Sequence, residues 1–108
     1  MLQKIGTLII ANGATRSGQL IIRDWKVTGI KVPTITGTKL TAYAASEEGG
    51  TETAVNDGEN AAVEIQLTAN KWAVWTEDNV QLNVPVLALE SDVAEGAQRS
   101  IEVWGVPR

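Results

Sequence analysis

The chain alternates hydrophobic and polar positions with a period of two over several of its segments. The clearest case is residues 61–68, where Ala61, Val63, Ile65 and Leu67 alternate with mostly polar neighbours. A β-strand with one face in a core and the other in water has this period. Other strand-like segments, rich in Ile, Val, Leu and Thr, are residues 3–11, 19–23, 25–32, 37–46, 80–86 and 99–103. The pattern therefore predicts an all-β protein.

Clusters of turn-forming residues separate these segments. They are Asn12-Gly13, Ser17-Gly18, Gly49-Gly50, Asn56-Asp57-Gly58 and Glu95-Gly96. A strand with its turn takes roughly 8–12 residues here, a spacing typical of a β-sandwich or barrel. Residues 42–48 have a helix-like composition, but they continue the alternation, so we expect a strand followed by a turn. We predict a single antiparallel β-sandwich domain over residues 1–108, with about eight or nine strands.

Two of the predicted strands change phase. In residues 25–32 the apolar residues at 25 and 27 share one face, whereas those at 30 and 32 share the other. A β-bulge at Thr28-Gly29, with the glycine adopting unusual dihedral angles, would bring all four to one side. Residues 86–89 change phase after Pro85. Because proline donates no hydrogen bond to a ladder, we expect this strand to be an edge strand or to bend there.

The composition excludes most catalytic chemistry. The 108 residues include no cysteine and no histidine, which removes thiol nucleophiles, the usual transition-metal ligands and the usual general base. Residues 56–60 are rich in oxygen ligands but lack the spacing of a calcium loop, so we interpret them as a hairpin turn. Adjacent carboxylates such as Glu47-Glu48 point to opposite faces of a strand. We therefore expect no enzymatic activity, no catalytic residues, no cofactor and no metal site.

The charge further limits the possible partners. The net charge of −4 argues against a nucleic-acid-binding protein, and no apolar run is long enough to span a membrane. We find no signal peptide, so we expect synthesis in the cytoplasm. Residues 1–39 hold six basic residues and one acidic residue, whereas residues 40–108 hold three basic and twelve acidic. Because sheets interleave distant segments, we expect this asymmetry not to become spatial; the alternative is a dipolar surface that orients the protein on a charged partner.

Four tryptophans stand out in a chain with no phenylalanine and one tyrosine. We interpret Trp25 and Trp72 as core residues, since each lies two positions from an apolar residue. Trp75 then faces the other way from Trp72 on a regular strand.

Trp104 lies on the same strand face as Glu102 and opposite Ile101 and Val103. An outward tryptophan is consistent with a protein interface, with a platform on which a sugar ring stacks, or with packing under a loop. The candidate partner-binding residues are Trp104, Glu102, Arg108 and Trp75.

Three segments resemble a known family when taken together. Residues 8–17 read LIIANGATRS and resemble an opening element of the form TIANGQTxS. Residues 27–51 read VTGIKVPTITGTKLTAYAASEEGGT and resemble LVGIxxPxxFTGTxITFxxSxDGGT. Residues 91–103 read SDVAEGAQRSIEV and resemble SGTAQAxxRTIxL. In this order they resemble small virion proteins of tailed bacteriophages, a family that includes head cement or decoration proteins. The match departs at Ile35, where an aromatic residue is expected, and over residues 71–83.

The resemblance implies a jelly-roll fold and a structural role in the virion. The implied function is a cement or decoration protein that is made in the host cytoplasm and binds the exterior of the capsid, where it stabilises the shell. The implied partner is the major capsid protein, and we expect a homo-oligomer, either a dimer or a trimer. The alternative is a carbohydrate-binding or interaction module of a phage tail, collar or fibre.

Overall fold

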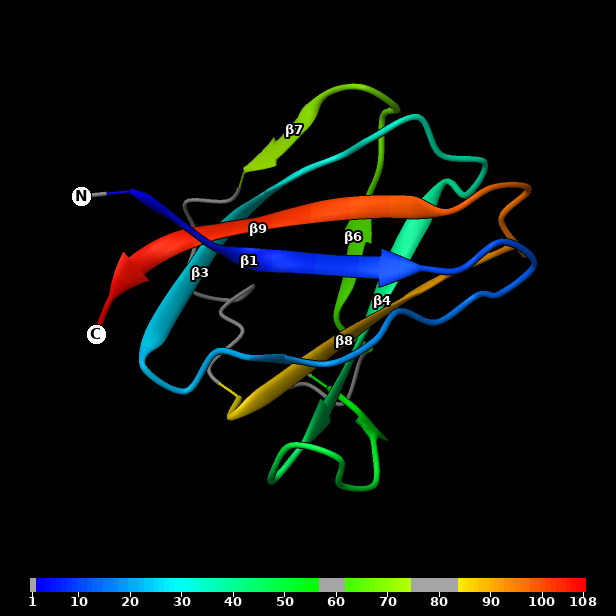
Figure 1. Cartoon of the computed structure of the whole chain (residues 1–108). Coiled ribbons are helices and arrows are strands. Elements are labelled where there is room, and N and C mark those ends of the chain that lie inside the picture. The colour runs from blue at the N-terminus through cyan, green and yellow to red at the C-terminus, as the bar shows by residue number, and fades with distance from the viewer. Residues whose placement is uncertain (1, 57–61, 75–83) are drawn as a thin grey trace.

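The computed structural model describes residues 2–56, 62–74 and 84–108, and these residues form β-strands, turns and loops without a helix. The strands are β1 (Gln3–Ile10), β2 (Leu20–Ile21), β3 (Trp25–Lys31), β4 (Lys39–Ala45), β5 (Thr53–Ala54), β6 (Glu64–Gln66), β7 (Trp72–Val74), β8 (Val86–Ser91) and β9 (Arg99–Pro107). Figure 1 shows these strands arranged in two layers. The predicted all-β class is confirmed.

The strands form two antiparallel sheets. The first sheet has the order β1-β9-β3-β7. The second has the order β2-β8-β4-β5, with β6 also paired to β4. The pairing is nested, because β1 pairs with β9, β2 with β8, β3 with β7, and β4 with β5 and β6. A chain paired in this way and rolled into two packed sheets is a jelly roll. The expected β-sandwich is therefore confirmed.

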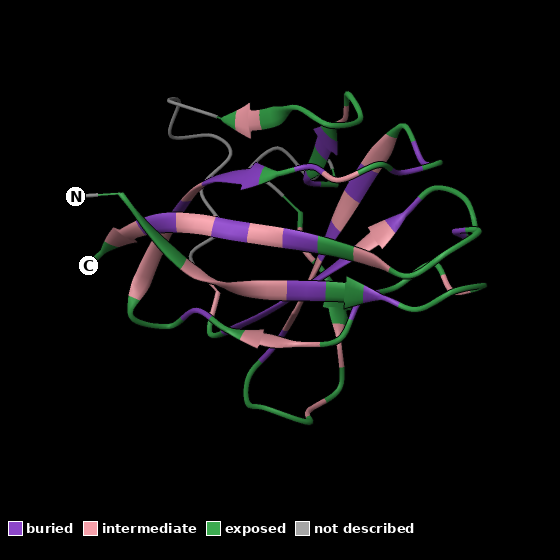
Figure 2. Ribbon diagram, turned by 45° about the horizontal axis from the view of Figure 1, so that its top comes forward, coloured by how far each residue is buried: buried purple, intermediate pink, exposed green. Residues whose placement is uncertain are grey.

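The hydrophobic core lies between the two sheets, and along β9 every second residue faces it. On β9, Ile101 and Val103 are fully buried, whereas Ser100 is exposed and Glu102 is half-buried. Figure 2 shows this alternation of burial along the strand. The fully buried side chains of the core are Leu8, Ile10, Ile22, Val27, Ile30, Leu40, Ala42, Leu87, Leu89, Ile101 and Val103.

The predicted bulge in β3 is present. The register between β3 and β9 shifts between Val27 and Gly29, which allows Val27, Ile30 and Val32 all to enter the core. The expectation of unusual dihedral angles at Gly29 is wrong, because its φ is not positive. The space beside the glycine is tight instead. A Cβ at this position would lie 3.1 Å from the carbonyl oxygen of Ala73 on β7.

The chain bends at Pro85, which confirms one of the two predicted alternatives, whereas the other, an edge strand, is wrong. β8 lies between β2 and β4, and residues 86–89 are all buried. Its second side is covered by β2 and by the segment before β2, where the Ser17 amide donates to the Leu89 carbonyl at 2.9 Å. Pro85 precedes the strand, so its missing amide N–H removes no hydrogen bond between β8 and its neighbours. Of the predicted 80–86 strand, residues 80–83 lie outside the described residues, as do residues 57–60 of the predicted 56–60 turn.

Glu95 joins three distant segments beside the core. Its carboxylate is buried and accepts hydrogen bonds from the Thr36 amide at 2.8 Å and the Gly37 amide at 3.0 Å. It also accepts from Ser91 Oγ and from Arg99 Nε, both at 2.9 Å. These contacts connect the loop before β4, the end of β8 and the start of β9.

The backbone of Glu95 forms hydrogen bonds with the segment after β1, which joins this segment to the other three. The Gly13 amide donates to the Glu95 carbonyl at 2.7 Å, and the Glu95 amide donates to the Ala14 carbonyl at 3.0 Å. Glu95 therefore contacts all three segments that carry the phage-protein resemblance, residues 8–17, 27–51 and 91–103. Those motifs stabilise the fold at this junction.

Candidate partner-binding surface

The strongest candidate surface is the outer face of the first sheet, which we call the tryptophan face. It contains Trp104 and Glu102 of β9, Lys31 of β3, and Trp72 and Val74 of β7. Trp104 alternates with the buried Ile101 and Val103, so its predicted outward orientation is confirmed.

Trp72 lies on this face and contacts Trp104. The two ring centroids are 5.4 Å apart at an interplanar angle of 64°, an edge-to-face arrangement favoured by the quadrupoles of aromatic rings. The interpretation of Trp72 as a core residue is wrong, because its side chain is 49% exposed. On β7 the half-buried Ala73 is flanked by the exposed Trp72 and Val74. The apolar residue two positions from Trp72, Val74, therefore shares an outward face with it and not a buried one.

Gly29 allows the two indoles to meet across β3. It is the Cα partner of Trp104 on β9 and of Val74 on β7. No side chain projects from β3 at this position, so the Trp104 ring can reach toward β7. The next outward position of β3, Lys31, pairs with Glu102 on one side and with Trp72 on the other.

Glu102 orients the indole of Trp104. Trp104 Nε1 donates a hydrogen bond of 3.0 Å to Glu102 Oε1, two residues earlier on the same strand face. This bond satisfies the polar edge of the ring while its apolar surface remains available. The two candidate residues thus form one unit.

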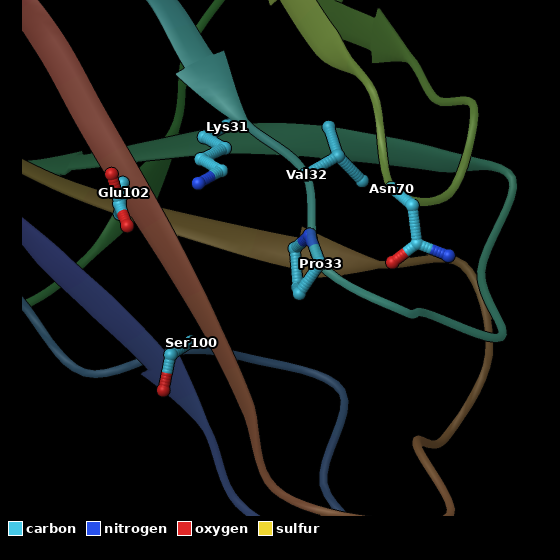
Figure 3. A pocket seen from close by; sticks show the side chains of 6 residues that line it. All are labelled: Lys31, Val32, Pro33, Asn70, Ser100 and Glu102. Atoms are coloured by element: carbon cyan, nitrogen blue, oxygen red, sulfur yellow. The ribbon is translucent and has the colours of Figure 1, made fainter.

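A pocket of about 330 Å³ borders the tryptophan face at Lys31 and Glu102. Figure 3 shows its lining residues, which come from the end of β3 and the segment after it, the turn before β7, and β9. They are Lys31, Val32, Pro33, Asn70, Ser100 and Glu102. Asn70 has a positive φ of 62°, and its Oδ1 accepts a hydrogen bond of 3.0 Å from Thr34 Oγ1. The pocket volume is at the lower end of the range for small-ligand sites.

Of the other two candidates, the structure describes only Arg108, which it places outside this unit. Arg108 lies beside the start of β3, where its Nε donates to the Trp25 carbonyl at 2.9 Å and its amide donates to the Asp24 carbonyl. Trp75 lies outside the described residues. Trp25, which we interpreted as core, is half-buried at the first position of β3.

The described residues contain no group of three or more acidic residues placed to hold a metal ion. Glu47 and Glu48 are exposed in the turn after β4. The same part of the chain contains no helix long and apolar enough to cross a membrane.

The comparisons with known proteins give a match in structure alone. No family model matches the chain, and no curated protein sequence matches it. Among solved structures, the chain is similar to the SPBc2 prophage-derived protein YomS, with a TM-score of 0.52 over 97% of this chain and 94% of that chain. The sequence identity is 13%, so the likeness shows the fold. The chain shares its β-sandwich with a protein of prophage origin.

Proposed function

We propose that the chain is a structural protein of a bacteriophage particle, a decoration or cement protein that binds the outside of the major capsid shell and stabilises it. The observation that carries this proposal is the tryptophan face, on which Trp72 is 49% exposed and Val74 is 64% exposed. Large apolar side chains that are partly exposed and adjacent are typical of protein interfaces. The prophage origin of a protein with the same fold supports the phage context.

The mechanism follows from the rigidity of the sandwich. Trp104 is held by Glu102 on one side and by Trp72 on the other, so its rotamer is already restricted before a partner arrives. Binding then costs less conformational entropy than it would for a mobile side chain. A protein that spans the seam between shell subunits in this way opposes their separation under internal pressure. We propose that it does so as a dimer or a trimer that matches a symmetry axis of the shell.

The pocket next to Lys31 and Glu102 favours a second candidate function. Its wall carries the amino group of Lys31, the amide of Asn70, the hydroxyl of Ser100 and the carboxylate of Glu102. Such a set of donors and acceptors next to apolar surface is also suitable for a saccharide. In this case the chain would be a carbohydrate-binding module of a tail, collar or fibre.

Cosedimentation with purified shells of the phage that encodes the chain tests the leading proposal. The test variant is Trp104→Ala, and the control is Ile21→Ala, which removes an exposed apolar side chain from β2 in the second sheet. We expect Trp104→Ala to weaken association by about 2 kcal/mol, roughly thirtyfold in Kd, as for an interface hot spot. The control should bind like the wild type.

The stability of the isolated domain is measured in parallel. Trp104→Ala removes one edge-to-face contact and one partly exposed hydrogen bond, so we expect a loss of about 1 kcal/mol in the free energy of unfolding. Unfolding of the isolated variant would identify Trp104 as a fold residue and contradict the interface. Specific binding to a glycan array that is abolished by Trp104→Ala would support the second candidate instead. Absence of wild-type binding to shells would overturn the leading proposal.

A further inference from the structure

The two outer faces of the sandwich differ in how their charges are compensated. On the second sheet the cations are paired: Arg16 contacts Glu90 at 2.9 Å and Glu52 at 3.2 Å, and Lys39 contacts Glu64 at 2.8 Å. Arg16 also lies over the ring of Tyr43, 3.8 Å from its centroid. These charges are largely neutralised within the molecule.

The first sheet carries lysines that are not compensated in this way. Lys4 is the Cα partner of Trp104, Lys26 that of Val106, and Lys31 that of Glu102, so all three project from the outer face. None of them forms an ion pair with a carboxylate of residues 2–56, 62–74 or 84–108. Among the described residues, Glu102 is the only acidic one on the strands of this sheet, and its carboxylate accepts a hydrogen bond from Trp104. The expectation that the charge asymmetry of the sequence would not become spatial is therefore wrong for this face.

We propose that the tryptophan face, together with Lys4 and Lys26, docks on an acidic protein surface. This inference rests on the proposed function, under which that surface is the outside of the capsid shell. Charge complementarity is the basis for choosing the partner: three lysines surround an exposed apolar centre, the arrangement of an interface with an anchoring core and a charged rim. The lysines steer the encounter, and the indoles supply the contact that holds the complex.

The apolar content of the face favours a protein over a nucleic acid. Val74 is 64% exposed and Ile9, on the outer side of β1, is 46% exposed. Neither contacts a phosphate backbone favourably. An acidic protein surface with apolar side chains at its centre fits all of these features.

The test compares two variants that each remove two positive charges, one pair from the tryptophan face and one pair from elsewhere on the surface. The face variant is Lys4→Gln/Lys31→Gln. The matched control is Arg23→Gln/Lys39→Gln, which removes the same two charges from the turn before β3 and from the second sheet. Binding to shells of the encoding phage is measured by cosedimentation as a function of NaCl concentration.

We expect the face variant to raise Kd about tenfold at low salt and to show a weaker dependence on salt than the wild type. The control should match the wild type within about twofold, since the charges that it removes do not face the partner. Both variants should melt within a few degrees of the wild type, because each affected side chain is on the surface.

Several outcomes would overturn the inference. If the wild type binds shells and the two variants are equally affected, the proposed function stands and the docking face is elsewhere. If the wild type does not bind shells, both proposals fail. If sedimentation velocity without shells shows that Lys4→Gln/Lys31→Gln changes self-association, the face binds a second copy of the chain. If a labelled single-stranded oligonucleotide binds the wild type more tightly than shells do, the partner is a nucleic acid.

Discussion

Removal of the Glu95 carboxylate should severely destabilise the domain. In the structure this group is buried and accepts four hydrogen bonds, from the amides of Thr36 and Gly37 and from the side chains of Ser91 and Arg99. Glu95→Ala leaves these donors without an acceptor in a space that the smaller side chain cannot fill. The effect is a cavity combined with a broken ion pair.

The magnitude follows from the two components. Breaking a buried pair by removing one partner costs about 3–5 kcal/mol, a figure that includes part of the desolvation of the stranded donors. A domain of this size has a total stability of about 5–15 kcal/mol. Since each kcal/mol corresponds to about 4–8 °C in a small domain, the melting temperature should fall by roughly 12–40 °C.

Urea unfolding at neutral pH, followed by tryptophan fluorescence, measures this loss. The matched control is Glu48→Ala, which removes an exposed carboxylate from a turn and should change the free energy of unfolding by less than about 0.5 kcal/mol. Glu95→Gln retains one oxygen acceptor and should give an intermediate loss, which keeps the test informative if Glu95→Ala does not fold. A loss of less than about 1 kcal/mol for Glu95→Ala would refute the reasoning.

The same carboxyl should make stability depend on pH. Burial by itself would raise the pKa of Glu95, but hydrogen bonds from Thr36, Arg99, Ser91 and Gly37 outweigh it and hold the pKa below its usual range. Because the folded-state pKa is lowered, this contribution is present above the unfolded pKa of about 4.3 and is lost as the pH falls through the folded pKa. We expect wild-type stability to decline below about pH 4, and Glu95→Gln to show a smaller decline.

Three further predictions use simpler measurements. Gly37→Ala should lower the free energy of unfolding by about 1–3 kcal/mol, because a Cβ there would collide with Ser91 Oγ. The control Gly96→Ala should leave the free energy of unfolding unchanged, because no atom lies within 4 Å of the added Cβ. Equal melting curves for the two variants would contradict this prediction. EDTA should not change the melting temperature, and a drop that calcium reverses would indicate a metal site. At high micromolar concentration, analytical ultracentrifugation should report a dimer or a trimer, and a clean monomer would count against self-association in free solution.

The faces of the strands could be predicted from the sequence because one side of each sheet is in the core. In β3 the phase change was sufficient to place the bulge between Val27 and Gly29. The sequence could not show why a glycine stands at position 29. The reason is the close approach of Ala73, which lies on a strand more than forty residues away in the chain. The edge assignment of β8 failed for a related reason: residues 15–17 have no strand-like pattern, yet their backbone lies along β8.

Only part of the candidate surface could be predicted from the sequence. The outward direction of Trp104 follows from the burial of Ile101 and Val103, but its contact with Trp72 depends on β7 pairing with β3 and on the gap at Gly29. Glu95 was interpreted as part of a turn, because a carboxylate next to glycine usually lies in water. Its burial depends on donors from the loop before β4 and from Arg99, which no local pattern identifies.

The nested pairing of the jelly roll has a consequence for how the chain folds. β9 lies between β1 and β3, with Leu8 opposite Ile101 and Ile30 opposite Val103. The first sheet therefore cannot form on the ribosome until residues 99–107 have been synthesised. Pairings between such distant segments slow folding, because the chain must close a large loop before any contact compensates for the lost entropy. Until then β1 and β3 expose unpaired edges that can pair with other chains. The risk of aggregation therefore falls when β9 pairs with both strands.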